Sequence, residues 1–144
     1  MTINTQLPLT YLVRREHFSA AHRLHSVHLS DEENARVFGK CNWENGHGHN
    51  YEIEVTVRGP IDPDTGMMMN LVDLKSLIED HILDKVDHRH LNHDVEEFKT
   101  INPTAENIAV VFWNWLKPHL GDSLYEMKVY ETPRNIAVYR GEQG

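Results

Sequence analysis

The residues from His49 to Arg58 constrain the fold more than any other stretch, because apolar and polar side chains alternate there without interruption. One face carries Tyr51, Ile53, Val55 and Val57, and the other carries Glu52, Glu54, Thr56 and Arg58. This pattern predicts a strand with one face against a core and the other against water or a wet interface. We therefore expect a sheet that is covered on one side only.

Other segments supply partners for this strand and a cover for the sheet. We expect further strands over Tyr11–Ser19, Leu124–Glu131 and Asn135–Arg140, and a short helical excursion over Asp31–Val37 that ends at Gly39. One amphipathic helix is capped by Asn70, and a second begins near Pro103 and ends at Gly121. The order ββααββ predicts one α+β domain over residues 1–144, with a four-stranded antiparallel sheet and two helices on one face. Its two uncovered edges favour pairing with other chains.

Composition limits the class of protein. With 14 basic and 22 acidic side chains, the formal charge is -8, which argues against nucleic-acid binding. The single cysteine excludes an internal disulfide and fits a reducing compartment. Residues 1–10 show no targeting pattern, and no stretch approaches the roughly 20 apolar residues of a membrane span. We therefore expect a cytoplasmic protein with neither nucleic-acid nor membrane partners.

The chain contains 11 histidines, an unusual number that directs attention to metal sites. His47 and His49 begin the alternating strand and face the same side, about 6 to 7 Å apart at the backbone. If the first two strands pair, His22 at the end of the first strand can lie beside them. Three histidines and an open fourth position describe a catalytic zinc site. Three surface histidines without metal are the alternative.

A cysteine and an Asp-His pair are candidates for proton transfer. Cys41 lies six residues before His47, and a thiol with an ordinary pKa near 8.5 is mostly protonated at pH 7. Asp87 could orient His88 as the base that activates this thiol. The alternatives are a small buried hydrophobe for Cys41 and a helix end that complements the dipole for the pair.

Glu131 is the last unusual position. It continues the apolar alternation of Tyr125, Met127 and Val129. A carboxylate on the inward face of a strand is costly unless it is paired or bound to a ligand. The alternative is that the strand ends there and the carboxylate is solvated.

Seven runs of residues, in a fixed order along the chain, carry a resemblance to a known family. They are Phe18–Leu24, Gly39–Asn42, Asn45–Tyr51, Met69–Lys75, Asp87–His88, Thr104–Asn107 and Val129–Thr132. Together they resemble the 6-pyruvoyl-tetrahydropterin synthase family over nearly the whole chain after the first ten or so residues. The chain departs from the family pattern where Ala105 follows Thr104, because a second threonine is expected there.

The resemblance implies an architecture and a set of site residues. It implies the tunnelling fold (T-fold), in which trimers close into a barrel by edge pairing and two trimers form a homohexamer with active sites at subunit interfaces. It implies one Zn²⁺ per subunit, with ligands His22, His47 and His49. By position, the further site residues are the base Cys41, its relay Asp87 and His88, the pterin anchor Glu131, and the pterin-pocket positions Thr104 and Glu106.

The resemblance also implies an activity. This is a lyase reaction of tetrahydrobiopterin biosynthesis that converts 7,8-dihydroneopterin triphosphate to 6-pyruvoyl-tetrahydropterin and triphosphate. Zinc acidifies the side-chain hydroxyls, the Cys41 thiolate removes a neighbouring C–H proton, and an internal redox change needs no nicotinamide. A rival of the same fold is 6-carboxy-tetrahydropterin synthase, disfavoured by the insertion Ser26–Gly39 and by Met69–Leu71. Another is a non-catalytic zinc- or pterin-binding module, which has no use for Cys41 with Asp87 and His88.

Overall fold

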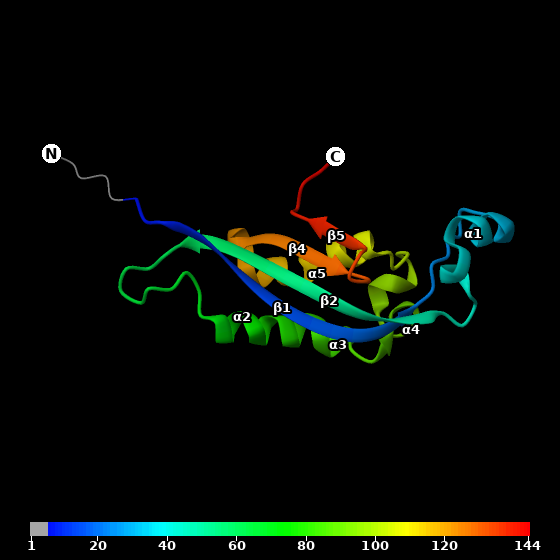
Figure 1. Cartoon of the computed structure of the whole chain (residues 1–144), viewed down its shortest axis with the longest axis horizontal. Coiled ribbons are helices and arrows are strands. Elements are labelled where there is room, and N and C mark those ends of the chain that lie inside the picture. The colour runs from blue at the N-terminus through cyan, green and yellow to red at the C-terminus, as the bar shows by residue number, and fades with distance from the viewer. Residues whose placement is uncertain (1–5) are drawn as a thin grey trace.

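Two long strands, β1 (Leu9–His22) and β2 (His47–Pro60), form the spine of the protein in a computed structural model that describes residues 6–144 (Figure 1). They pair antiparallel in one unbroken register of fourteen residue pairs. Beyond β2 follow β4 (Leu124–Tyr130) and β5 (Ile136–Tyr139), each antiparallel to its neighbour. The four strands expected from the sequence are therefore confirmed, with β1 longer at both ends than expected.

The sheet contains a fifth strand, so the expectation of four antiparallel strands was wrong. The two-residue strand β3 (Arg89–His90) pairs in parallel with Ala20 and Ala21 on the outer edge of β1. The strand order is β3-β1-β2-β4-β5, and the sheet is mixed. A helical crossover returns the chain in the direction of β1, which makes the pairing parallel. Two residues are too few to show an alternation, so the sequence pattern does not reveal this strand.

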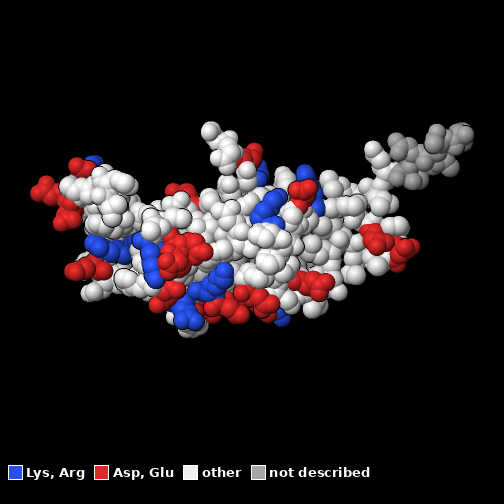
Figure 2. Space-filling model, turned by 180° about the vertical axis from the view of Figure 1, so that it is seen from behind, with Lys and Arg blue, Asp and Glu red and all other residues white. Residues whose placement is uncertain are grey.

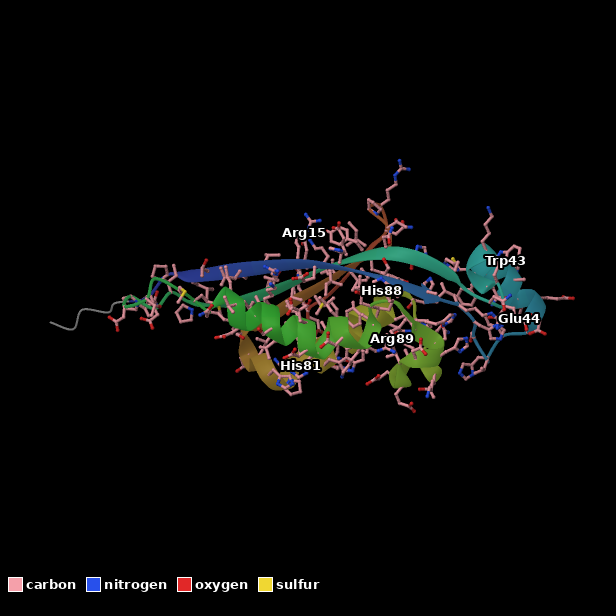
Figure 3. The ribbon with its side chains drawn as sticks, turned by 90° about the horizontal axis from the view of Figure 1, so that it is seen from below. Arg15, Trp43, Glu44, His81, His88 and Arg89 are labelled. Atoms are coloured by element: carbon pink, nitrogen blue, oxygen red, sulfur yellow. The ribbon has the colours of Figure 1, made fainter. Side chains whose placement is uncertain are left out.

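The helices cover one face of the sheet, as expected. Seen from below, the sheet and the helices form two layers, and Arg15 projects from the open face (Figure 3). The helical elements are α1 (Asp31–Phe38), η1 (Gly39–Asn42), α2 (Leu71–Ile78), η2 (Glu79–Leu83), α3 (Asp84–Val86), α4 (Leu91–Asp94), η3 (Glu96–Lys99), α5 (Ala105–Leu120) and η4 (Gly121–Ser123). Within residues 6–144, no helix has the length and apolar character needed to cross a membrane. The first five residues, part of the segment searched for a targeting signal, lie outside the described residues.

The first long helix, predicted as one amphipathic helix after Asn70, is interrupted: the π-helical turn η2 separates α2 from α3. Its fully buried side chains recur every four residues, at Leu74, Ile78, Ile82 and Val86. An α-helix has 3.6 residues per turn, so a four-residue spacing drifts around the axis. The π-helical turn η2 is wider and offsets this drift. All four side chains therefore reach the core.

Local capping sets the helix boundaries. The Asn70 side chain accepts a hydrogen bond from the Val72 amide, which confirms the predicted start of α2. The second long helix, α5, begins at Ala105 rather than at Pro103, because Thr104 caps it. It ends at Gly121, as predicted, where φ is 55°.

A β-bulge changes which β4 side chains face the core. The pairing of β2 with β4 shifts register between Thr56 and Val57. As a result Leu124 is buried, while Tyr125 is only partly buried and packs edge-on against Tyr11 of β1. The expected inward alternation was wrong at Tyr125. It holds for Met127 and Val129, which are fully buried.

A buried asparagine holds the excursion between β1 and β2. The Asn34 side chain is fully buried and accepts a hydrogen bond from the Ser26 amide at 2.8 Å. Its amide group donates to the carbonyl oxygens of Ser26, Leu29 and Ser30 at 2.9 to 3.2 Å. One side chain therefore closes the loop that precedes α1.

Asn34→Ala should loosen this excursion without unfolding the sheet. Loss of the Asn34 side chain leaves several partly buried backbone groups unpaired, and each costs roughly 1 kcal/mol or more of local stability. The Ser26 amide should therefore exchange with solvent at least about tenfold faster. Hydrogen exchange measured by NMR tests this, with the exposed Arg36→Ala on the same helix as control. Equal exchange in both variants would contradict the role given to Asn34.

Candidate active site

The register of β1 on β2 brings three histidines together at one end of the buried face of the sheet. His22 lies directly opposite His47, and His49 follows on the same face of β2. One potential ligand atom from each lies within 4.8 Å of the others, and Nε2 of His22 is 3.2 Å from Nε2 of His47. The predicted convergence is confirmed, and the group can hold a metal ion.

Two groups behind the histidines orient the His22 ring. Nδ1 of His22 is 2.8 Å from the Pro103 carbonyl oxygen and 3.1 Å from the Tyr51 hydroxyl. A carbonyl oxygen only accepts, so Nδ1 carries the proton and Nε2 presents its lone pair to the other rings. Sequence reasoning missed both groups. Tyr51 could have been found, because it continues the alternation of His47 and His49, whereas a backbone contact 81 positions away leaves no local signal.

The histidine rings have the properties of metal ligands. Nδ1 of His47 and Nε2 of His49 are buried and have no hydrogen-bond partner in the described part of the chain. Burial lowers the pKa of His22 to about 4 and also lowers the pKa of His49, so both rings are neutral at pH 7. Neutral imidazole is the form that binds metal. Three nitrogen donors fit a catalytic zinc site better than a structural one.

Glu131 lies between the histidines and an open cavity. It follows the last residue of β4, and its largely buried carboxylate is 3.8 Å from Nε2 of His49. The cavity has a volume of about 560 Å³ and is lined by Glu131, Thr104 and Glu106. Thr104 is placed there because it caps α5, and Glu106 lies in the first turn. The three positions expected to contact a pterin therefore surround one cavity beside the histidine cluster.

Cys41 lies in the short helix η1. Its carbonyl oxygen accepts a hydrogen bond from the Leu24 amide at 2.8 Å, which ties η1 to the chain just beyond His22. Burial, and then the negative charge of Glu131, raise the pKa of the Cys41 thiol. The thiol is therefore protonated at neutral pH in the isolated chain, and forming a thiolate requires a further group.

Asp87 and His88 form the expected pair, but at the other side of β1. Asp87 Oδ1 is 3.0 Å from Nδ1 of His88 and accepts a hydrogen bond from the Ser19 amide, which is the main reason its pKa is lowered. His88 is strongly exposed and has a φ of 62°, a strained value that only this non-glycine residue shows among residues 6–144. In that range no hydrogen bond joins Cys41 to either residue. The structure therefore does not bring Cys41, Asp87 and His88 of one chain together as a proton relay.

Comparison with known proteins agrees with this geometry. The family model for 6-pyruvoyl tetrahydropterin synthase matches residues 11–142. The chain is 53% identical to 6-pyruvoyl tetrahydrobiopterin synthase of Drosophila melanogaster over 139 residues, 95% of this chain and 83% of that protein. It is 55% identical to the Homo sapiens protein of that name over 130 residues, 90% of each. The solved structure of the Caenorhabditis elegans 6-pyruvoyl tetrahydropterin synthase is similar with a TM-score of 0.92 and 47% identity, over 96% of this chain and 99% of that one.

Metal-free protein should lose stability as the pH falls from 6.5 towards 4. In that interval the unfolded His22, with a pKa near 6.5, takes up a proton that the folded His22, with a pKa of about 4, does not. The contribution of neutral His22 to the free energy of unfolding is complete above pH 6.5 and declines by about 3 kcal/mol by pH 4. Urea unfolding with a chelator at several pH values measures this slope. His22→Gln should flatten it, and an equal slope in both proteins would contradict the assignment.

Proposed function

The chain belongs to the 6-pyruvoyl tetrahydropterin synthase family, and on this premise we propose that it converts 7,8-dihydroneopterin triphosphate to 6-pyruvoyl-tetrahydropterin and triphosphate. The relatives named above are enzymes, and a lyase role in pterin biosynthesis follows from membership. The observation that carries the specific reaction is the cluster of His22, His47 and His49, which meets the Glu131 carboxylate at the edge of one cavity.

Glu131 is the proposed anchor of the pterin ring. A carboxylate can accept two parallel hydrogen bonds, one from the amino group and one from the ring N–H of a pterin. The carboxylate is largely buried, so little water competes for these bonds. Thr104 and Glu106 line the same cavity and limit where the ring can lie.

The histidines and Cys41 are the proposed chemical groups. The three imidazoles would hold one zinc ion, which supplies Lewis acidity to the hydroxyl groups of the substrate side chain. The Cys41 thiolate takes the neighbouring C–H proton, and the electron pair moves into the ring imine. Triphosphate then leaves by elimination. Oxidation of the side chain balances reduction of the ring, so the proposal needs no nicotinamide.

The relay is proposed to act between subunits. Asp87 and His88 lie at the outer edge of β1, and β3 covers only Ala20 and Ala21 of that edge. Pairing of another subunit at this edge would bring the relay of one chain to the thiol of another. Five partly exposed apolar side chains support an oligomer: Leu9, Tyr11, Val13, Ile136 and Val138. We propose the T-fold barrel of three subunits, two of which form a homohexamer, in a reducing cytoplasmic compartment.

Two other functions remain distinguishable by experiment. A 6-carboxy-tetrahydropterin synthase would remove carbons from the side chain of the same substrate, so analysis of the pterin product separates it. The names of the similar proteins support the pyruvoyl-forming reaction. A non-catalytic binding module would bind the substrate and release no triphosphate.

Cys41→Ala should separate chemistry from metal binding. The variant should keep its zinc, because the three histidines provide the ligands, and should lose about a hundred- to ten-thousand-fold in turnover, as expected for a positioned base. Elemental analysis and turnover are measured on the same sample. His47→Ala with His49→Ala is the control that should lose zinc. Near-normal turnover of Cys41→Ala would remove the thiol from the mechanism, and lost zinc would make it a metal ligand.

Mixing two inactive variants tests the relay between subunits. Cys41→Ala and His88→Ala subunits are mixed in equal amounts, unfolded together and reassembled. Random pairing then combines an intact Cys41 of one subunit with an intact His88 of its neighbour at roughly a quarter of the interfaces, so roughly a quarter of parent activity should return. Each variant reassembled alone is the control. A mixture that stays as inactive as its components would place Cys41 and His88 of the same chain in one site.

A further inference from the structure

A second cavity lies at the end of the sheet opposite the histidines. It has a volume of about 480 Å³ and forms where β2, α5 and the segment after β5 meet. Its lining includes Arg58, Trp113, Lys117, Tyr125, Tyr139 and Arg140. Arg58 follows His47 by eleven positions along β2, which is roughly 35 Å in a strand. The cavity is therefore remote from the histidine cluster of the same chain.

Arg58 is a fixed cation without an acidic partner. Its guanidinium carbon is 5.0 Å from the ring centre of Tyr125 and 6.0 Å from that of Tyr11. The two rings pack edge to face, with their centres 5.0 Å apart. No carboxylate in the described range of the chain lies within 4.0 Å of this guanidinium. The rings hold the charge in place and leave its N–H groups free for a ligand.

The β-bulge creates this arrangement. The register shift between Thr56 and Val57 takes Tyr125 out of the core and places its ring under Arg58. A bulge commonly re-aims a side chain next to a functional site. The bulge in the sheet thus determines where the Arg58 guanidinium lies.

The other two cations are only partly neutralised. Nε of Arg140 donates to Glu126 at 2.8 Å, and the remaining guanidinium nitrogens have no hydrogen-bond partner in the structure as described. Nζ of Lys117 donates to the Gly121 carbonyl oxygen and is 3.8 Å from fully exposed Asp122, a pair that contributes little. Among the residues that line the cavity, Glu142 is the one carboxylate. Within the described residues, Arg58 is therefore the cation of this lining that no carboxylate pairs, in a chain that carries -8.

The opposite end of the molecule has the reverse character. Acidic side chains gather there over α1, whose first turn contains Asp31, Glu32 and Glu33 (left in Figure 2). The local cluster of cations therefore stands out against the charge of the whole chain.

We propose that this cavity binds the phosphate groups of a small anionic ligand. Two guanidinium groups can each donate two hydrogen bonds to phosphate oxygens, and Lys117 adds a point charge. A phosphate group presents three or four acceptor oxygens in a tetrahedral arrangement that can face cations on different walls of a cavity, whereas a carboxylate presents two oxygens in one plane. Gly141, with a φ of 74°, brings the chain against Trp113 and closes one wall, since an added Cβ would lie 2.7 Å from that ring.

Calorimetric titration with inorganic triphosphate tests the site. The zinc-loaded protein and the His47→Ala, His49→Ala double variant are titrated in parallel, because the second cannot bind triphosphate through the zinc centre. We expect the double variant to keep one binding site per chain. Arg58→Gln in that background should weaken it at least about tenfold, as loss of hydrogen bonds to a charged group does. Arg36→Gln, also an exposed arginine but on α1, should leave it unchanged.

The outcomes separate this site from the proposed reaction. Loss of all triphosphate binding in the double variant, or equal affinity in the Arg58→Gln and Arg36→Gln proteins, would overturn the proposal. Lys117→Gln is a second variant that should also weaken binding. Inorganic phosphate should compete and acetate should not, and equal competition by acetate also counts against a phosphate site. Turnover of the zinc-loaded Arg58→Gln protein should match that of the parent. Turnover therefore tests the proposed reaction, and triphosphate affinity tests the phosphate site, independently of each other.

Discussion

The pairing of β1 with β2 is the constraint on which the rest of the structure depends. Its fourteen-residue register places His22 opposite His47, with the core side chains of both strands on the same face as the histidines. A slip of one residue would turn every one of these side chains to the open face. Burial of Tyr51, Ile53 and their neighbours therefore stabilises the register, and the register assembles the site. Core packing and metal-ligand geometry have the same origin.

Burial affects the groups of the site in opposite ways. It lowers the pKa of His22, which keeps the ring in the form that binds metal, and it raises the pKa of Cys41, which keeps the thiol protonated. One chain thus holds neutral imidazoles and a protonated thiol. Asp87 and His88 lie beside Ser19 at the outer edge of β1, where the Asp87 carboxylate and the His88 amide bond the Ser19 backbone. The proposed assembly of subunits rests on this position of the pair and on the sheet edge beside it.

Three irregularities of the backbone occur where side chains must be re-aimed. The π-helical turn keeps Ile82 directed at the core, and the positive φ of His88 turns its ring towards solvent. The β-bulge takes Tyr125 to the second cavity, beside Arg58. Each costs some local stability, and each is held by packing or hydrogen bonds from neighbouring elements. The two ends of the long strands thereby differ in chemistry, with neutral imidazoles at one end and arginines at the other.

Four of the strands, the helix-capping positions Asn70 and Gly121, and the convergence of the three histidines could be predicted from the sequence. Alternation and capping act within a few residues, and a His-x-His pair on a strand has only one geometry. The parallel pairing of β3, the bulge at Thr56 and the contact of Pro103 with His22 could be read only from the tertiary structure. These features depend on contacts between residues far apart in the chain, and the energy of such contacts is set by packing that no local pattern records.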